Sequence, residues 1–162
     1  MINRVFRIDD RLIHGQVIVG WVKRLELDCI IVANDLVVGD TLQRNLMELA
    51  IPKEVKTYFY GLDDAAAALK GPQLVDRRFI VLLESLQDAL DLVNRGVVIE
   101  ELNVGGLHFR NSKKQYAPYL FLDEDDMDAI RGLTALNVRM CCQPLPDDPK
   151  NDIHKLIPKE SE

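Results

Sequence analysis

Near the start of the chain, a histidine follows two aspartates and two arginines: Arg7, Asp9, Asp10, Arg11 and His14. Imidazole is nucleophilic at neutral pH, because its unperturbed pKa is about 6.5. A phosphohistidine needs one free ring nitrogen and nearby donors for the phosphoryl oxygens, and the guanidinium of Arg11 is a fork-shaped donor that suits phosphate. Asp9 or Asp10 can orient the imidazole or hold the arginines in place. These residue types therefore suit a histidine that carries a phosphoryl group.

An apolar-periodic segment follows His14 and predicts a helix. The first residues of this helix would present free backbone amides, and anions bind favourably at such a position. The alternative is a histidine that caps the helix or packs in the loop, and the residue types alone do not decide between the two. The candidate catalytic residues are His14, Arg11 and Asp10, and the candidate phosphate contacts are Arg11, Gly15, Gln16 and Val17.

A second polar loop, at 105–115, follows a predicted strand. Its candidate rim or partner contacts are a glycine pair, a histidine and a lysine pair: Gly105, Gly106, His108, Lys113 and Lys114. The glycines permit close backbone approach, and the lysines add positive charge, so the loop is a second phosphate-facing wall or a docking surface. Its spacing is not that of a Walker-type phosphate loop. His108 is interpreted as a loop histidine that packs or hydrogen-bonds, in preference to a second proton-transfer group.

Asn34 and Asp35 end another apolar run and complete, with Asp9, the candidate rim contacts. They reach the His14 loop from a neighbouring strand end, or they form a turn that caps the next helix. Both interpretations stay open from the sequence.

Short apolar runs alternate with helical periodicities along the whole chain. Strands are predicted at 2–8, 28–33, 55–60, 78–83, 99–104, 119–122 and 137–142. Helices are predicted at 15–25, 40–50, 62–70, 85–95 and 123–136, with a short one at 153–156. The helix at 40–50 is expected to start at Asp40 or Thr41 and to bury one face, formed by Leu42, Leu46 and Leu49. The glycine pair is expected to end the strand at 99–104, and the acidic run at 123–128 to be a solvated helix start.

This alternation predicts a single α/β domain, residues 1–162, with a mostly parallel open β-sheet and helices on both faces. Ligands of such sheets sit outside the carboxyl ends of the strands. The loops at 9–14, 34–40, 84–85 and 105–115 all follow strands, so they are expected to open on one rim.

Composition narrows the class of protein. The chain has 162 residues, 48% hydrophobic and 28% charged, with a formal net charge of -6, which argues against a nucleic-acid protein. No apolar run approaches the roughly 20 residues of a membrane span, and the first residues lack a signal-peptide pattern, so a cytoplasmic location is expected. The cysteines, Cys29, Cys141 and Cys142, are expected to be buried free thiols. The dispersed histidines give no metal-type spacing.

The segment from Arg7 to Val17 closely resembles the active-site signature of the IIB component of the mannose/fructose/sorbose class of bacterial sugar phosphotransferase systems. Similar segments follow in the family's order, at 31–35, 103–109 and 113–115. The region after Val138 and the charged tail look more individual.

The resemblance implies an open α/β sheet and a phosphohistidine at His14. It implies that the group comes from a phosphohistidine on the IIA component and passes to a sugar bound by the membrane components IIC and IID. Arg11 matches the motif arginine expected at the phosphate, and Asp10 its neighbouring acid. The resemblance implies no metal or organic cofactor, and contact with the inner face of the membrane only through IIC and IID. A homo-oligomer is left open.

Two other functions compete with transport. A regulatory phosphohistidine module of the same fold would signal sugar flux without feeding uptake, and the motif fits both. A nucleotide-binding α/β domain is weaker, because the glycine fingerprint after the first strand is missing.

Overall fold

The computed structural model describes residues 4–159, and within them the fold is built on nine strands. They are β1 (Arg4–Asp9), β2 (Cys29–Ala33), β3 (Lys56–Tyr60), β4 (Phe79–Leu83), β5 (Glu101–Gly106), β6 (Lys114–Ala117), β7 (Leu120–Leu122), β8 (Arg139–Cys142) and β9 (Asn151–Asp152). Seven of these strands form one sheet in the order β3-β2-β4-β1-β5-β8-β9, and β6 and β7 form a separate hairpin. Every pairing in the large sheet is parallel except that of β8 with β9.

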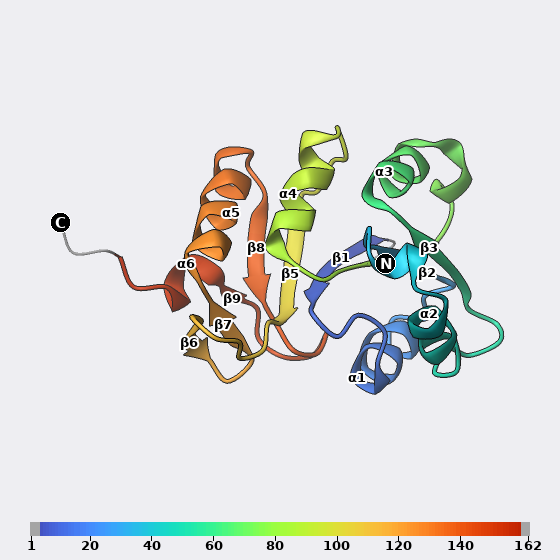
Figure 1. Cartoon of the computed structure of the whole chain (residues 1–162), viewed down its shortest axis with the longest axis horizontal. Coiled ribbons are helices and arrows are strands. Elements are labelled where there is room, and N and C mark those ends of the chain that lie inside the picture. The colour runs from blue at the N-terminus through green and yellow to red at the C-terminus, as the bar shows by residue number, and fades with distance from the viewer. Residues whose placement is uncertain (1–3, 160–162) are drawn as a thin grey trace.

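Helices connect the parallel strands and cover both faces of the sheet (Figure 1). They are α1 (Gly15–Val17), its π-helical continuation η1 (Ile18–Lys23), η2 (Val37–Gly39), α2 (Thr41–Glu48), α3 (Leu62–Lys70), η3 (Pro72–Leu74), α4 (Leu86–Asn94), α5 (Glu124–Ala135) and α6 (Ile153–Leu156). One core cluster joins the sheet to α1, η1 and α2, and the other joins it to α3, α4 and α5. The predicted α/β architecture is confirmed.

The central strands show why the apolar runs were informative. Every residue of β2 and of β4 is buried, as expected for parallel strands that helices cover on both faces. The predicted helix starts are also confirmed. Asp40 accepts a hydrogen bond from the Gln43 amide at 3.0 Å, and Ser85 accepts one from the Asp88 amide at 3.1 Å.

The expected inward face of α2 is wrong. Leu42, Leu46 and Leu49 are 71%, 60% and 84% exposed, whereas Met47 is the buried residue of this helix. Periodicity tells which residues of a helix share a face, but it does not tell whether that face turns toward the sheet. Here the helix contacts the core through Met47, and the leucine stripe faces outward.

Stability measurements test this orientation. We expect Leu46→Ser to change the free energy of unfolding by no more than about 0.5 kcal/mol, because the side chain is already exposed. Leu92→Ser on α4 is the matched variant, and it should cost at least about 3 kcal/mol because Leu92 is fully buried. Urea unfolding of both variants gives the comparison. A loss above about 2 kcal/mol for Leu46→Ser would contradict an exposed α2 face.

Three further expectations need correction. β5 does not end before the glycine pair but runs through Gly106, because Gly105 is the extra residue of a bulge: Ile8 pairs with Val104 and Asp9 with Gly106. The predicted loop at 105–115 ends inside strand β6, which begins at Lys114, runs to Ala117 and pairs with β7. The acidic start of α5 is not wholly solvated, since Asp126 is 2% exposed and completes a capping box with Asp123.

Candidate functional site

His14 and Asp9 form the centre of the site, at the carboxyl end of β1. His14 has an extended backbone at the start of α1, and its side chain turns to Asp9 rather than to the helix. His14 Nε2 lies 3.0 Å from Asp9 Oδ2. The carboxyl is 1% exposed, whereas the imidazole is 18% exposed. His14 is therefore held by a buried carboxyl group, and part of its ring is open to solvent.

The charge of Asp9 decides the tautomer of His14. Burial alone would raise the Asp9 pKa, but the hydrogen bond and charge of His14 and the charge of Arg7 together bring it below its ordinary value. Asp9 is therefore ionised at neutral pH and can only accept a hydrogen bond. The proton of a neutral His14 then resides on Nε2, and Nδ1 keeps its lone pair.

Arg7 is the buried cation beneath this pair. Its Nη2 lies 3.4 Å from Asp9 Oδ2, and its guanidinium donates to the backbone oxygens of Gln143 at 2.9 Å and Pro144 at 3.2 Å, and to the side chain of Asn103. Burial lowers the Arg7 pKa to about 10 despite the opposing effect of Asp9, so the side chain stays charged at neutral pH. Arg7 therefore balances the charge of the carboxylate that holds His14.

Gly105 makes room for Arg7. A Cβ on Gly105 would lie 1.9 to 2.0 Å from the guanidinium atoms, a separation that atoms cannot adopt. The glycine is required because the strand backbone approaches a buried side chain closely, which is one of the roles of glycine in strands. The contact of Gly105 is therefore with Arg7.

The Asp10 carboxylate is hydrogen-bonded to His108. The His108 backbone amide donates to Asp10 Oδ2 at 2.8 Å, and its ring nitrogen Nδ1 lies 2.5 Å from Asp10 Oδ1. The other ring nitrogen, Nε2, lies 2.8 Å from Arg11 Nη2. Arg11 also donates its backbone amide to Asp9 Oδ1 at 3.2 Å. The two adjacent aspartates therefore hold different histidines, and Arg11 contacts Asp9 directly and Asp10 only through His108.

The amides that follow His14 start a helix. The Ile18 amide donates to the His14 carbonyl oxygen at 3.1 Å, and the amides of Gly15, Gln16 and Val17 precede it. Gly15 and Gln16 are exposed, whereas Val17 is buried in the core. The segment can thus present backbone donors beside the open side of His14.

Asn34 and Asp35 accept hydrogen bonds from backbone amides at the starts of η2 and α3. The side-chain oxygen of Asn34 accepts from the Leu36 and Val37 amides at 3.0 and 2.9 Å, and its amide donates to Glu84 at 2.6 Å. Asp35 accepts from the amide of Leu62, the first residue of α3, at 2.8 Å. Asn34 therefore forms the expected turn, at the start of η2, whereas Asp35 caps α3 and not the next helix along the chain.

The lysine pair also has local partners. Lys113 Nζ lies 2.8 Å from Asp126 Oδ2, and both side chains are almost buried. Lys114 Nζ lies 5.7 Å from the centre of the Tyr116 ring. The structure thus brings His14, Asp9, Asp10, Arg11, Gly106 and His108 together, and it directs Lys113 to α5.

Sequence reasoning missed the residues that hold Arg7. Asn103 and Gln143 are buried polar residues, and the Trp21 ring centre lies 4.6 Å from the guanidinium carbon. A polar residue inside an apolar strand was the available signal for Asn103, since a buried polar group needs a partner. The strand position of Arg7 was another, because residues two apart in a strand share a face.

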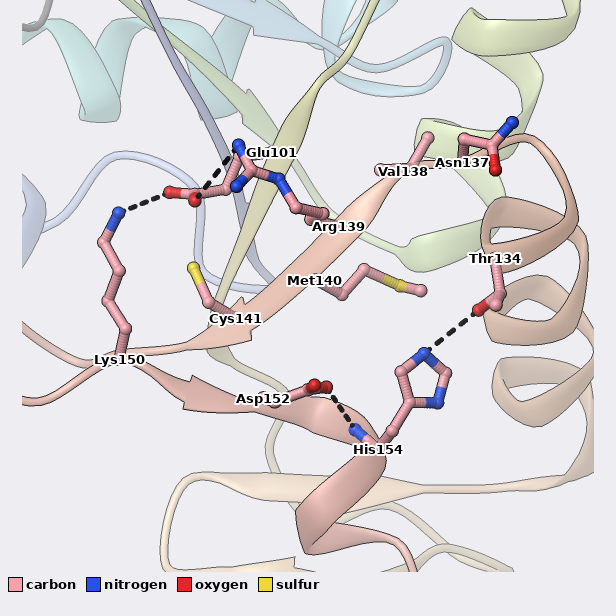
Figure 2. A pocket seen from close by; sticks show the side chains of 10 residues that line it. All are labelled: Glu101, Thr134, Asn137, Val138, Arg139, Met140, Cys141, Lys150, Asp152 and His154. Carbon is pink, nitrogen blue, oxygen red and sulfur yellow. Dashed lines mark hydrogen bonds and ion pairs between the residues drawn. The ribbon is translucent and has the colours of Figure 1, made fainter.

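A cavity of about 480 Å³ lies away from this cluster, between β8, β9 and α5 (Figure 2). Its charged lining groups contact one another. Glu101 pairs with Lys150 at 2.5 Å and with Arg139 at 4.0 Å, and the His154 ring contacts Thr134 at 3.2 Å. We therefore place the candidate site at His14.

Comparisons with known proteins agree on one family. Residues 3–162 match the family model described as PTS system sorbose subfamily IIB component. The sorbose-specific EIIB component of Klebsiella pneumoniae is 38% identical over 147 residues, which cover 91% of this chain and 90% of that relative. The mannose-specific EIIAB component of Escherichia coli K12 is 33% identical over 159 residues, which cover 98% of this chain and 49% of that relative.

A solved structure of the same family has a closely similar fold. The IIBSor domain of the sorbose permease from Klebsiella pneumoniae superposes with a TM-score of 0.89 at 36% identity, over 97% of this chain and 96% of that one. None of the helices within residues 4–159 has the length and apolar character needed to cross a bilayer.

Proposed function

Because the chain belongs to the sorbose subfamily of phosphotransferase-system IIB components, we propose that it carries a phosphoryl group on His14 during sugar uptake. His14 accepts the group from a phosphohistidine on a IIA component and passes it to a sugar bound by the membrane components IIC and IID. The protein is then a cytosolic protein-phosphohistidine–sugar phosphotransferase that meets the membrane through its partners. The choice of sugar rests with IIC and IID.

The observation that carries this proposal is the Asp9–His14 contact. This contact favours the tautomer with the proton on Nε2, in which the lone pair of Nδ1 is available to phosphorus. In the transfer, Nδ1 bonds to phosphorus while the bond from phosphorus to the donor histidine breaks, and the electron pair of that bond returns to the donor ring. Nε2 keeps its proton, and Asp9 stabilises the positive charge that develops on the imidazole. In the onward transfer, the sugar hydroxyl oxygen bonds to phosphorus while the bond from phosphorus to Nδ1 breaks. The electron pair of that bond returns to the His14 ring, and the hydroxyl proton is released to solvent.

The surrounding charges favour the phosphorylated state. Arg11 and the amides of Gly15, Gln16 and Val17 are the donors for the phosphoryl oxygens. An unbalanced Asp9 carboxylate would repel the phosphoryl group, but the buried charge of Arg7 offsets it. Transfer between two histidines needs little chemical driving force, so the protein mainly supplies position and charge.

The name of one relative supports the choice of a IIA component as the phosphoryl donor. A mannose-specific EIIAB component contains a region similar to this chain in about half of its length. Its name joins a IIA and a IIB part, so we infer that a IIA component of this class is the phosphoryl donor here. The partly exposed imidazole of His14 suits a residue that two partners must reach in turn.

Labelling with phosphoenolpyruvate and the upstream transfer proteins tests the proposal. We expect acid-labile phosphate on the wild-type chain and at least a 100-fold loss of label in His14→Ala, because the nucleophile is gone. His154→Ala is the matched control, since this histidine lies on α6, and it should label like the wild type. Wild-type label on His14→Ala would overturn the assignment. Label on His14 without sugar phosphorylation in IIC/IID membranes would overturn the transport role.

A further inference from the structure

The strongest unassigned feature beside the site is the chain of contacts from Asp10 through His108 to Arg11. The Asp10 carboxylate accepts two hydrogen bonds from His108, one from the backbone amide and one from the ring nitrogen Nδ1. Asp10 is itself fixed, because its amide donates to the Gly106 carbonyl oxygen at 2.9 Å. His108 is therefore held by backbone and side chain together, and its remaining ring nitrogen points at Arg11.

The two partners of the His108 ring indicate which of its nitrogens carries the proton. Arg11 has only donors, so the contact at 2.8 Å between its Nη2 and His108 Nε2 requires a lone pair on Nε2. Asp10 as a carboxylate has only acceptors, so the proton of His108 is on Nδ1. The tautomer with the proton on Nδ1 and the lone pair on Nε2 gives a matching hydrogen bond to Asp10 and to Arg11.

We propose that His108 is a positioning residue that holds Arg11 for the phosphoryl group on His14. This inference rests on the proposed function. His108 binds one terminal nitrogen of the guanidinium through its Nε2 lone pair, while the Arg11 backbone is fixed on Asp9, the carboxylate that also holds His14. The remaining guanidinium donors stay available to phosphoryl oxygens. His108 itself touches no reacting atom.

Such a role explains why an exposed arginine is held both by its backbone amide, on Asp9, and by its guanidinium, on His108. Arg11 is solvent-exposed, and a long side chain at the surface loses rotamer freedom when it binds a ligand. A donor that is already oriented loses less of that freedom in the transition state, so it stabilises the developing charge more effectively. The His108 contact provides the orientation, and the Asp10 contacts fix His108.

Three variants separate positioning from a structural role. His108→Asn keeps a donor near Asp10 but lacks an acceptor at the depth of Nε2, whereas His108→Gln offers an amide oxygen at that depth. We measure single-turnover phosphorylation of His14 by phosphorylated IIA over a range of IIA concentrations. We expect His108→Asn to lower the maximal rate about tenfold with an unchanged half-saturating IIA concentration, and His108→Gln to restore most of the rate. In an Arg11→Ala background, His108→Asn should have no further effect.

The outcomes distinguish this inference from the function on which it rests. If wild-type protein labels at His14, then a wild-type rate for His108→Asn, or an effect fully additive with that of Arg11→Ala, overturns the inference alone. If the wild-type protein is not labelled at His14, the result overturns both the proposed function and this inference. Nitrogen NMR of the unphosphorylated wild type gives a readout that needs no variant to fold: the proton of His108 should reside on Nδ1, and a proton on Nε2 would overturn the inference.

Discussion

Replacing Asp9 with asparagine is expected to slow phosphoryl transfer onto His14 by about 100-fold to 10,000-fold, the cost of giving a catalytic histidine the wrong tautomer. Asparagine has nearly the shape of aspartate, but its amide can donate to Nε2 and so favours the proton on Nδ1. The ring then presents its proton, rather than its lone pair, to the incoming phosphorus. Single-turnover labelling by phosphorylated IIA measures the rate.

Asp10→Asn is the matched variant, because the two residues are adjacent and differ in the histidine that they hold. It should slow transfer at least tenfold less than Asp9→Asn, since its effect passes through His108 and Arg11. Asp9→Asn also leaves the buried charge of Arg7 less well balanced, so urea unfolding should accompany the rates to show that both variants are folded. If Asp10→Asn proves the more damaging variant, Asp9 is not the residue that sets the tautomer.

The pH dependence of stability follows from the same carboxylate. The pKa of Asp9 is lower in the folded chain than its ordinary value, so the ionised form is favoured by folding. Its contribution to stability is present at neutral pH, above the unfolded pKa, and is lost as the pH falls through the folded pKa. Because its pKa is lowered, Asp9 stays ionised to a lower pH than an ordinary carboxyl does, so the Arg7–Asp9 pair should persist until the pH falls below the ordinary pKa of aspartate.

The sheet could be predicted because its central strands are continuous apolar runs. The residues of β2 and β4 are buried on both faces, and short continuous apolar runs are typical of parallel strands in that position. The orientation of α2 could not be predicted in the same way. Its leucine stripe has the periodicity of a core face, but the burial of Met47 decides how the helix sits, and that depends on packing that is not local in sequence.

The site was only partly predictable for a related reason. The motif indicated His14 and gave Asp10 as the catalytic acid, with Asp9 only as a rim contact. In the structure, Asp9 is the aspartate that contacts the His14 ring, and Asp10 contacts His108. Successive strand residues point in opposite directions, so one of the two had to turn away. The same alternation puts Arg7 and Asp9 on one face and could have indicated their ion pair. The Asp10–His108 contact joins residues 98 positions apart, and no local pattern encodes it.

Gly105→Ala should be the most destabilising small substitution near the site, with a loss of about 3–5 kcal/mol in the free energy of unfolding. The added Cβ would lie 1.9 Å from the guanidinium carbon of Arg7, so the guanidinium must leave its place. It then loses Asp9 and the Gln143 and Pro144 carbonyl oxygens, and a buried charge without its partner typically costs this much. Backbone strain is not the cause, since Gly105 is not among the residues of positive φ in the described part of the chain. Urea unfolding measures the loss.

Gly39→Ala is the matched control, because no described atom lies within 4 Å of a Cβ at that glycine, and it should unfold like the wild type. A second comparison shows that the loss acts through Arg7. Once the Gly105→Ala substitution has displaced the guanidinium, Arg7→Ala has little left to remove, so the double variant should be much less destabilised than the sum of the two single variants. Full additivity, or a Gly105→Ala chain as stable as the wild type, would mean that Arg7 does not occupy this site in solution. The carboxylate that sets the tautomer of His14 would then have no buried cation beneath it.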